Sequence, residues 1–303
     1  MEPNWALACK RPALEARARI LQSIRAFFVG RDYLEVETPQ RIPGNAPESY
    51  IDAVPSGDWY LHTSPELCMK RLLAASYPRL FQLCRCWRQG ERGDRHLPEF
   101  SMLEWYRSGC DYHALMEECE ALLRTLVPSG ELRWQGQTLD LISPWQRLSV
   151  AEAFARYASI PLDKALDSGR FDECLALEIE PQLGRTTPTF LTEYPAELAA
   201  LARHKPGDPT VAERFELYLC GIELANAFSE LTDAAEQRRR FAAEEARRRA
   251  AGKPPYPSPE HFLAELSAMP PAAGIALGLD RLVMLLTDKV RIDEVVAFSP
   301  EAL

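Results

Sequence analysis

The chain has 303 residues, 47% of them hydrophobic, so it can bury a substantial core as one large domain or two small ones. Its 44 acidic and 35 basic side chains give a formal net charge of −9, which argues against a bulk electrostatic grip on nucleic acid but allows a local basic groove. No basic-then-apolar signal opens the chain, and no apolar run approaches the roughly 18 residues of a membrane span. We therefore expect a cytoplasmic protein that does not enter a membrane.

The first third of the chain predicts a helix, a strand, and a strand followed by a helix. These segments are residues 11–29, 33–44 and 58–76, and the first strand stops at Pro39. In the third segment Ser64 suits the N-cap, Pro65 the first helical position and Glu66 the first turn. Glu66 alone carries no functional signal, because an acidic residue is favoured at any helix start.

The remaining segments predict more strands than crossover helices. Strands are expected at 79–88 and 98–107, joined by a glycine-bearing loop, a hairpin at 213–231, and helices at 111–127, from Ser149 onward and at 232–252. The second hairpin should turn near Cys220 and Gly221. The arginine runs of the last helix are interpreted as a solvated face. An antiparallel sheet flanked by helices, in a single α+β domain over residues 1–303, fits this order best.

Residues 273–286 begin with alternating small and apolar residues and end as an amphipathic helix. Asp280 is the expected N-cap, which places Arg281 in the first turn. A cation is mildly unfavourable there because a helix start carries positive partial charge. Arg281 should therefore either reach water or face an anion that the site binds.

The eight cysteines include no C-x-x-C pair, and a single residue separates Cys84 from Cys86. That separation is too short for the usual spacing of metal ligands. We expect buried free thiols in a reducing compartment.

One strand combines aromatic and acidic side chains on one face. Alternate residues of a strand share a face, so Phe100, Met102, Glu104 and Tyr106 lie together. Phe100 could stack on a flat base, while Glu104 and Tyr106 could hold an ammonium group. An edge strand with a half-solvated face is the alternative.

The loop before this strand is rich in charge. It carries Arg88, Glu91, Arg92, Arg95 and His96. The arginine fork suits phosphate because it donates two parallel hydrogen bonds and stays charged. A solvated hairpin loop is the simpler interpretation from this segment alone.

The second hairpin offers spaced carboxylates without histidine. Asn226, Phe228 and Glu230 share a face, and Glu216 and Glu223 are nearby. Such carboxylates suit Mg²⁺ bound with ATP phosphates better than zinc. Glu223 has the opposite parity from Glu230, so both reach one site only if the strand bulges between them. Solvent-facing glutamates are the alternative.

Three ordered segments, "FFVGRDYLEVETP", "RCWRQGERGDRHLPEFSMLEWY" and "GIALGLDRLVML", resemble motifs 1, 2 and 3 of class II aminoacyl-tRNA synthetases. The resemblance spans residues 11 to 299 and is nearest to lysyl-tRNA synthetases in "TSPEL", "FLTEYPAE" and "ANAFSELTDA". Lysyl-tRNA synthetases carry an anticodon-binding domain before motif 1, and because motif 1 comes early in this sequence we expect no such domain here. The chain is therefore similar to the shortened paralogues that modify elongation factor P. Those ligases activate lysine or (R)-β-lysine with ATP and transfer it to a lysine side chain of that protein.

The resemblance implies roles for individual residues. Arg88 and Arg281 would be catalytic and would bind the ATP phosphates from opposite sides, and Phe100 would stack on adenine. The complete ATP set it implies is Arg88, Gln89, Gly90, Glu91, His96, Leu97, Phe100, Glu223, Leu224, Gly278 and Arg281. The implied substrate set is Ser64, Pro65, Glu66, Glu104, Tyr106, Asn226, Phe228, Glu230 and Ala276, and Glu216 and Glu223 would hold Mg²⁺.

Motif 3 and motif 1 add two further expectations. Lysyl-tRNA synthetases have glycine where Ala276 stands, and the added methyl group suits a β-amino acid. Motif 1 forms the dimer interface in class II enzymes, so Phe27, Phe28 and Val36 are expected at an exposed face of a C2 homodimer. A compact lysyl-tRNA synthetase core acting on tRNA and a catalytically silent regulatory homodimer are the alternatives. The expected lack of an anticodon domain and the negative charge argue against tRNA as a partner.

Overall fold

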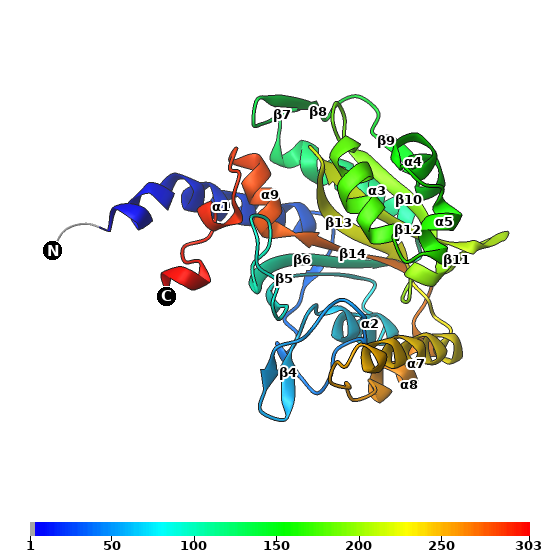
Figure 1. Cartoon of the computed structure of the whole chain (residues 1–303). Helices are drawn as coiled ribbons and strands as arrows, with labels where there is room; N and C mark the ends of the chain where they lie inside the picture. The colour runs from blue at the N-terminus through cyan, green and yellow to red at the C-terminus, as the bar shows by residue number, and fades with distance from the viewer. Residues whose placement is uncertain (1–3) are drawn as a thin grey trace.

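A nine-stranded sheet, antiparallel apart from two pairs of strands, runs through the computed structural model, which describes residues 4–303 (Figure 1). Its main path runs β1-β5-β6-β14-β13-β12-β10-β9, and β11 pairs with β12. The strands of this sheet are β1 (Leu34–Glu35), β5 (Arg79–Trp87), β6 (Glu99–Ser108), β9 (Gln146–Ser149), β10 (Thr189–Pro195), β11 (His204–Lys205), β12 (Asp208–Leu219), β13 (Ile222–Ser229) and β14 (Ala272–Gly278). Only the β1–β5 and β9–β10 pairs within the described residues are parallel.

Helices cover the sheet unequally. They are α1 (Trp5–Val29), α2 (Glu66–Ala74), α3 (Tyr112–Leu126), α4 (Val150–Tyr157), α5 (Leu162–Asp167), α6 (Phe171–Cys174), α7 (Ala234–Ala250), α8 (Glu260–Glu265) and α9 (Leu279–Leu286). One face packs against α1, α3 and α9 in the main core. On the other face α2, α7 and α8 cluster at one end and α4 to α6 at the other (Figure 1). The expected α+β architecture is confirmed.

Alternation along the strands separates an apolar face from a polar one. In β6, Leu103 and Trp105 are fully buried in the main core, whereas Glu104 and Tyr106 point to the opposite face. The predicted common face of Phe100, Met102, Glu104 and Tyr106 is thus confirmed, and it looks into a cavity.

The two predicted hairpins are both present. β5 pairs with β6 and β12 with β13, and the second hairpin turns at Cys220 and Gly221, which have φ values of 55° and 72°. Two successive positive φ values match the twist of a tight hairpin. The register shifts where Leu217 faces Ala225 but Tyr218 faces Glu223, which leaves Leu224 as the extra residue. This is the bulge that the position of Glu223 required.

The segment after α1 forms less sheet than expected. Only Leu34–Glu35 joins the main sheet, and Arg41–Ile42 (β2) belongs to a separate small sheet with β3 (Pro55–Ser56) and β4 (Trp59–Leu61). Another two-stranded unit, β7 (Glu131–Trp134) with β8 (Gln137–Asp140), lies outside both sheets. Helix α2 begins at Glu66, yet the Ser64 hydroxyl still accepts the Glu66 N–H at 3.0 Å.

Asp280 is not the N-cap of α9. The helix starts at Leu279 after Gly278, and the Asp280 carboxylate points back into the protein. It accepts the backbone N–H of Ser101 at 2.8 Å and lies 2.5 Å from the Arg17 guanidinium on α1. These long-range partners outweigh the local capping preference. Arg281 does lie in the first turn, as predicted.

Phe27 and Phe28 are not exposed, contrary to the expectation for a subunit interface. They are 4% and 0% exposed, because Phe28 packs against Tyr33, Phe81 and Trp105 in the main core. Val36 is half-buried. The apolar side chains left exposed in this region are Val29 and Leu34, at 59% and 49%.

All eight cysteines are free thiols, and only some are buried. Cys86, Cys119, Cys174 and Cys220 are buried, Cys68, Cys84 and Cys110 are half-buried, and Cys9 is exposed, which corrects the expectation for Cys9. None of the helices formed by residues 4–303 combines the length and apolar character needed to cross a membrane.

Asp280→Ala should lower the free energy of unfolding by about 3 kcal/mol, because it leaves the Arg17 guanidinium and the Ser101 N–H without their buried partner. Urea unfolding measures this change. Glu15→Ala is the matched control. It removes the exposed partner of Arg11 on α1, the helix that also carries Arg17, and should have no measurable effect. Equal losses in the two variants would contradict the assignment of a structural role to Asp280.

Candidate active site

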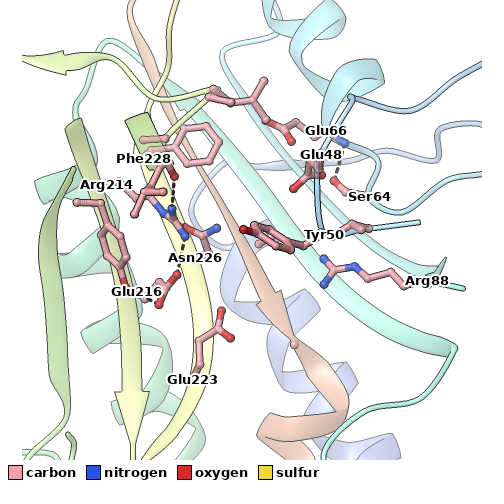
Figure 2. Close-up of a pocket in the computed structure, with 18 of the residues that line it drawn as sticks. Glu48, Tyr50, Ser64, Glu66, Arg88, Arg214, Glu216, Glu223, Asn226 and Phe228 are labelled. Carbon is pink, nitrogen blue, oxygen red and sulfur yellow. Dashed lines mark hydrogen bonds and ion pairs between the residues drawn. The ribbon is translucent and has the colours of Figure 1, made fainter. Parts of the chain in front are cut away.

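A cavity of about 890 Å³ lies on the polar face of the main sheet, between the α2–α7–α8 end and the α4–α6 end. Its floor comes from β6, β14, β13 and β12. Figure 2 shows Glu48, Ser64 and Glu66 on one side of it and Glu216 and Glu223 on the other. A cavity of this size suits a ligand as large as a nucleotide with a small substrate.

Glu104 forms the centre of an acidic pocket on β6. It accepts hydrogen bonds from the Tyr106 hydroxyl at 2.5 Å and the Ser64 hydroxyl at 2.7 Å. Burial, followed by the nearby Glu66 carboxylate, raises the pKa of Glu104 to about 8. A cationic group entering this pocket would favour the ionised carboxylate. Gly274 on β14 leaves room for the pocket, because a Cβ there would overlap the Tyr106 ring and Glu230.

Lys70 on α2 is a site residue that the sequence analysis missed. Its ammonium lies 2.5 Å from Glu66 and 2.6 Å from Glu230, and 4.9 Å from the centre of the Phe228 ring. Burial lowers the pKa of Lys70, but Glu230 and Glu66 outweigh it and the net shift is upward. Two carboxylates expected to hold substrate are thus already neutralised in part by the chain itself. The spacing of Lys70 from Glu66, four residues along a predicted helix, was the available signal.

The sequence analysis also missed Arg214 on β12, although it lies two residues before Glu216 and therefore shares its face of the strand. Its guanidinium donates to the Asn226 side chain at 3.0 Å and to Glu216 at 2.6 Å (Figure 2). Glu216 additionally accepts from the Tyr194 and Tyr218 hydroxyls at 2.5 and 2.6 Å. Burial is the largest influence on Glu216 and raises its pKa. The resulting network fixes the Glu216 carboxylate at the cavity wall.

The opposite wall is rich in arginine. Arg281 donates to the Glu223 carbonyl at 2.8 Å and lies 3.1 Å from its carboxylate, and a second nitrogen lies 2.5 Å from His96 Nε2. Burial raises the pKa of Glu223, but Arg281 outweighs it and the net shift is downward. Arg88 lies 5.1 Å from the Phe100 ring centre and 3.7 Å from Glu91. The anion that Arg281 faces in this structure is therefore Glu223.

Most of the predicted site residues line this one cavity. They are Ser64, Glu66, Arg88, Glu91, His96, Leu97, Phe100, Glu104, Tyr106, Glu216, Glu223, Leu224, Asn226, Phe228, Ala276, Gly278 and Arg281. Four of the predicted residues do not line it. Pro65 and Glu230 are buried behind its wall, while Gln89 and Gly90 lie in the exposed turn after β5. The Gln89 N–H donates to the Asp52 carbonyl, and Gly90 has a φ of 79°.

Carboxylates beside the arginines fit a hard cation. Glu216 and Glu223 both line the cavity, and Glu180 is near enough that burial followed by these two carboxylates raises its pKa to about 7. Oxygen donors of this kind suit Mg²⁺, which keeps several waters and phosphate ligands of its own. The residues therefore fit the magnesium ion that the sequence suggested.

The lining of the cavity contains a further carboxylate that the sequence analysis missed. Glu48 is half-buried beside Ser64 and Glu66 (Figure 2), and its side chain has no hydrogen-bond partner within residues 4–303. Burial raises the pKa of Glu48 to about 7. Arg248 on α7 fixes this segment by donating to the carbonyls of Glu48 and Ile51 at 2.8 and 2.9 Å. Arg248 is thus buried, unlike the solvated face predicted for its helix.

Lys70→Met should lower the free energy of unfolding by about 3–5 kcal/mol at neutral pH, because Glu66 and Glu230 lose their buried cation. Acidification should reduce the loss, since protonation neutralises the carboxylates left behind. Urea unfolding of the variant and the native chain across pH measures both effects. Arg71→Met, beside it on α2 with an exposed partner, is the control and should change stability little. A Lys70→Met loss that grew at low pH would contradict this account.

Comparison with known proteins identifies relatives along nearly the whole chain. Residues 9–302 match the family described as tRNA synthetases class II (D, K and N). Curated relatives named elongation factor P–(R)-β-lysine ligase are 40% identical in Pseudoalteromonas translucida and 39% identical in Vibrio cholerae, each alignment covering 97% of both chains. The Salmonella arizonae ligase of the same name is 40% identical over 98% of this chain and 97% of its own.

Proposed function

The chain belongs to the family of class II tRNA synthetases, and from this premise we propose that it is an elongation factor P–lysine ligase. It would activate (R)-β-lysine or lysine with ATP and transfer it to a lysine side chain of elongation factor P in the cytoplasm. The observation that carries the proposal is one cavity that joins an acidic pocket around Glu104 to an arginine-rich wall around Arg88 and Arg281. The ligase names of relatives that match 97% of the chain support it.

The first step joins the two halves of the cavity. Glu104, with Tyr106 and Ser64, would hold the substrate ammonium so that the substrate carboxylate faces Arg88. A carboxylate oxygen attacks the α-phosphorus, the bond to the pyrophosphate oxygen breaks, and an aminoacyl-adenylate remains. Arg88 and Arg281 stabilise the charge on the phosphoryl oxygens. Glu216 and Glu223 would hold Mg²⁺, which neutralises phosphate charge when bound.

The second step requires a deprotonated amine from the acceptor lysine. Its nitrogen attacks the carbonyl carbon of the adenylate, an amide bond forms, AMP leaves, and a proton must be removed. Glu48 is our candidate for the proton acceptor. It lines the cavity beside Ser64 and Glu66, its side chain has no hydrogen-bond partner within the described residues, and its pKa of about 7 suits a base at neutral pH.

Aminoacylation assays separate this function from its two rivals. The purified chain is incubated with ATP and either (R)-β-lysine or lysine, and the acceptor is either elongation factor P or tRNA. We expect substrate-dependent exchange between ATP and pyrophosphate, and a mass increase of elongation factor P. Charging of tRNA alone would identify a compact lysyl-tRNA synthetase core. Absence of exchange with every substrate would identify a catalytically silent homodimer and overturn the proposal.

Arg281→Ala should weaken ATP use for every amino acid by about 2 kcal/mol or more, because a desolvated phosphate contact is lost. Stability should change by no more than about 1 kcal/mol, since a cation is poorly placed at a helix start and the Arg281–Glu223 pair that is lost is part-exposed. Pyrophosphate exchange and urea unfolding measure the two effects. Arg92→Ala, on the same hairpin loop as His96 but paired with Asp293 and Glu301, is the control. Unfolding of Arg281→Ala with normal exchange per folded molecule would make Arg281 structural.

Glu48→Gln should slow transfer to the acceptor on the order of 100-fold while pyrophosphate exchange is affected far less. A base must be ionised to accept a proton, so transfer by the native chain should fall as pH drops below about 7, the pKa of Glu48, and the variant should lack this dependence. Single-turnover transfer from preformed adenylate measures both. An equal loss in exchange and transfer would instead place Glu48 in substrate binding.

We infer a C2 homodimer, supported by the synthetase family and by Val29 and Leu34, which are exposed beside the first strand of the main sheet. Light scattering at micromolar concentration should give twice the mass of the chain. Val29→Asp should shift the mass toward that of the monomer, whereas Leu177→Asp, at an exposed apolar residue distant in sequence, should not. A fully active monomer would contradict the proposal.

A further inference from the structure

Three soft and borderline ligands meet outside the cavity lining. The thiols of Cys84 and Cys86 and a ring nitrogen of His62 all lie within 4.8 Å of one another. Cys84 and Cys86 project from the same face of β5 because they are two residues apart on a strand. His62 follows β4 of the small sheet, so the group joins two separate sheets.

Backbone hydrogen bonds fix the position of His62 beside β5. The His62 carbonyl accepts the Trp87 N–H at 3.0 Å, and the His62 N–H donates to the Gln40 carbonyl at 2.8 Å. His62 and Cys86 are 1% and 0% exposed, whereas Cys84 is half-buried and offers a route from solvent. The Met102 thioether lies 3.9 Å from the Cys86 sulfur on the neighbouring strand.

The distances fit a metal ion better than a disulfide. The two sulfurs are 3.8 Å apart, and two thiolates bound to tetrahedral zinc at about 2.3 Å lie about 3.8 Å apart. Cys86 Sγ is 3.9 Å from His62 Nε2, slightly more than the roughly 3.6 Å of the corresponding zinc site. A disulfide would instead draw the sulfurs to about 2.05 Å and bring together two side chains separated by a full repeat of an extended strand.

We propose that His62, Cys84 and Cys86 form a binding site for a thiophilic d¹⁰ ion, Zn²⁺ or Cu⁺. Thiolate and imidazole are the ligands that such ions prefer, and the nearby thioether adds weight to Cu⁺. His62 Nε2 now lies 2.6 Å from the Arg85 carbonyl, to which it donates its proton. Binding releases both thiol protons, the His62 proton moves from Nε2 to Nδ1 so that Nε2 can bind the ion as a neutral ligand, and the ring turns from the carbonyl toward the sulfurs.

The proposed metal site lies close to the active-site cavity, but the ion would not take part in the reaction. Cys86 lies near the end of β5, two residues before Arg88, which follows the strand, and Met102 lines the cavity. The inference does not depend on the proposed ligase activity, because it concerns residues of this chain that the mechanism does not use. Metal content is measured without substrate, so failure of either proposal leaves the other intact.

Metal binding to the reduced full chain tests the proposal. The chain is dialysed against Zn²⁺, against Co²⁺ as a spectroscopic substitute, and against Cu⁺ kept reduced, and metal content is measured by mass spectrometry. We expect one Zn²⁺ or one Cu⁺ per chain, and thiolate-to-metal charge-transfer absorption with Co²⁺. Cys84→Ser, Cys86→Ser and His62→Ala should each lose the ion, while Cys110→Ser, another half-buried cysteine, should keep it.

The outcomes that overturn the proposal are distinct. Absence of stoichiometric metal in the native chain, or retention of metal by Cys84→Ser, would rule out the site. Equal loss in Cys110→Ser would show non-specific thiol binding. A mass lower by two hydrogens after mild oxidation, together with no metal uptake, would identify a Cys84–Cys86 disulfide instead. If the buried Cys86→Ser fails to fold, the half-buried Cys84→Ser and the Co²⁺ spectrum of the native chain still decide the matter.

Discussion

The cost of removing charge from water governs the polar face of the central sheet. Several charged side chains there are paired: Lys70 on α2 with Glu230, which follows β13, Arg214 with Glu216 within β12, and Arg281 on α9 with Glu223 on β13 in a part-exposed contact. Since an unpaired buried charge is far more costly than a paired one, the Lys70–Glu230 pair fixes α2 against the sheet. Arg214 also donates to Asn226 on β13, and Arg281 links α9 to β13. The cavity lies between these paired elements. Its acidic part surrounds Glu104, and its basic part contains Arg88 and Arg281.

Patterns within a single element were sufficient to predict much of this architecture. Two-residue alternation predicted both hairpins and the common face of Glu104 and Tyr106, and the parity of Glu223 required a bulge that lies at Leu224. Such features depend on backbone geometry and neighbours along the chain. The resemblance in the three motifs added which residues share a site, and the cavity brings most of them together.

The predictions that were wrong depended on contacts between distant segments. Asp280 is a residue type favoured at the N-cap, but its carboxylate instead pairs with Arg17 and accepts the Ser101 N–H. Phe28 looked like an interface residue because two of the aromatic residues that pack on it, Phe81 and Trp105, follow much later in the sequence. Glu48 escaped notice for the same reason, because the Arg248 side chain that binds its carbonyl lies 200 residues away. Arg214 had a local signal, since it lies two residues before Glu216 on the same strand. The expectation that Cys84 and Cys86 are not metal ligands stays untested; the spacing alone could not show that a His62 ring nitrogen lies within 4.8 Å of both thiols.

The strand order delays completion of the central sheet until nearly the whole chain has been synthesised. β14, at residues 272–278 of 303, is inserted between β6 and β13, so the middle of the sheet waits for nearly the last segment of the chain. Gly274 pairs with Tyr106, which lies far away in the sequence, so this contact closes a long loop. Contacts between such distant residues slow folding. On the ribosome the two halves of the sheet carry unpaired edges until that strand emerges. The nascent chain therefore depends on protection from aggregation, and a truncation before β14 removes the floor of the cavity together with the centre of the fold.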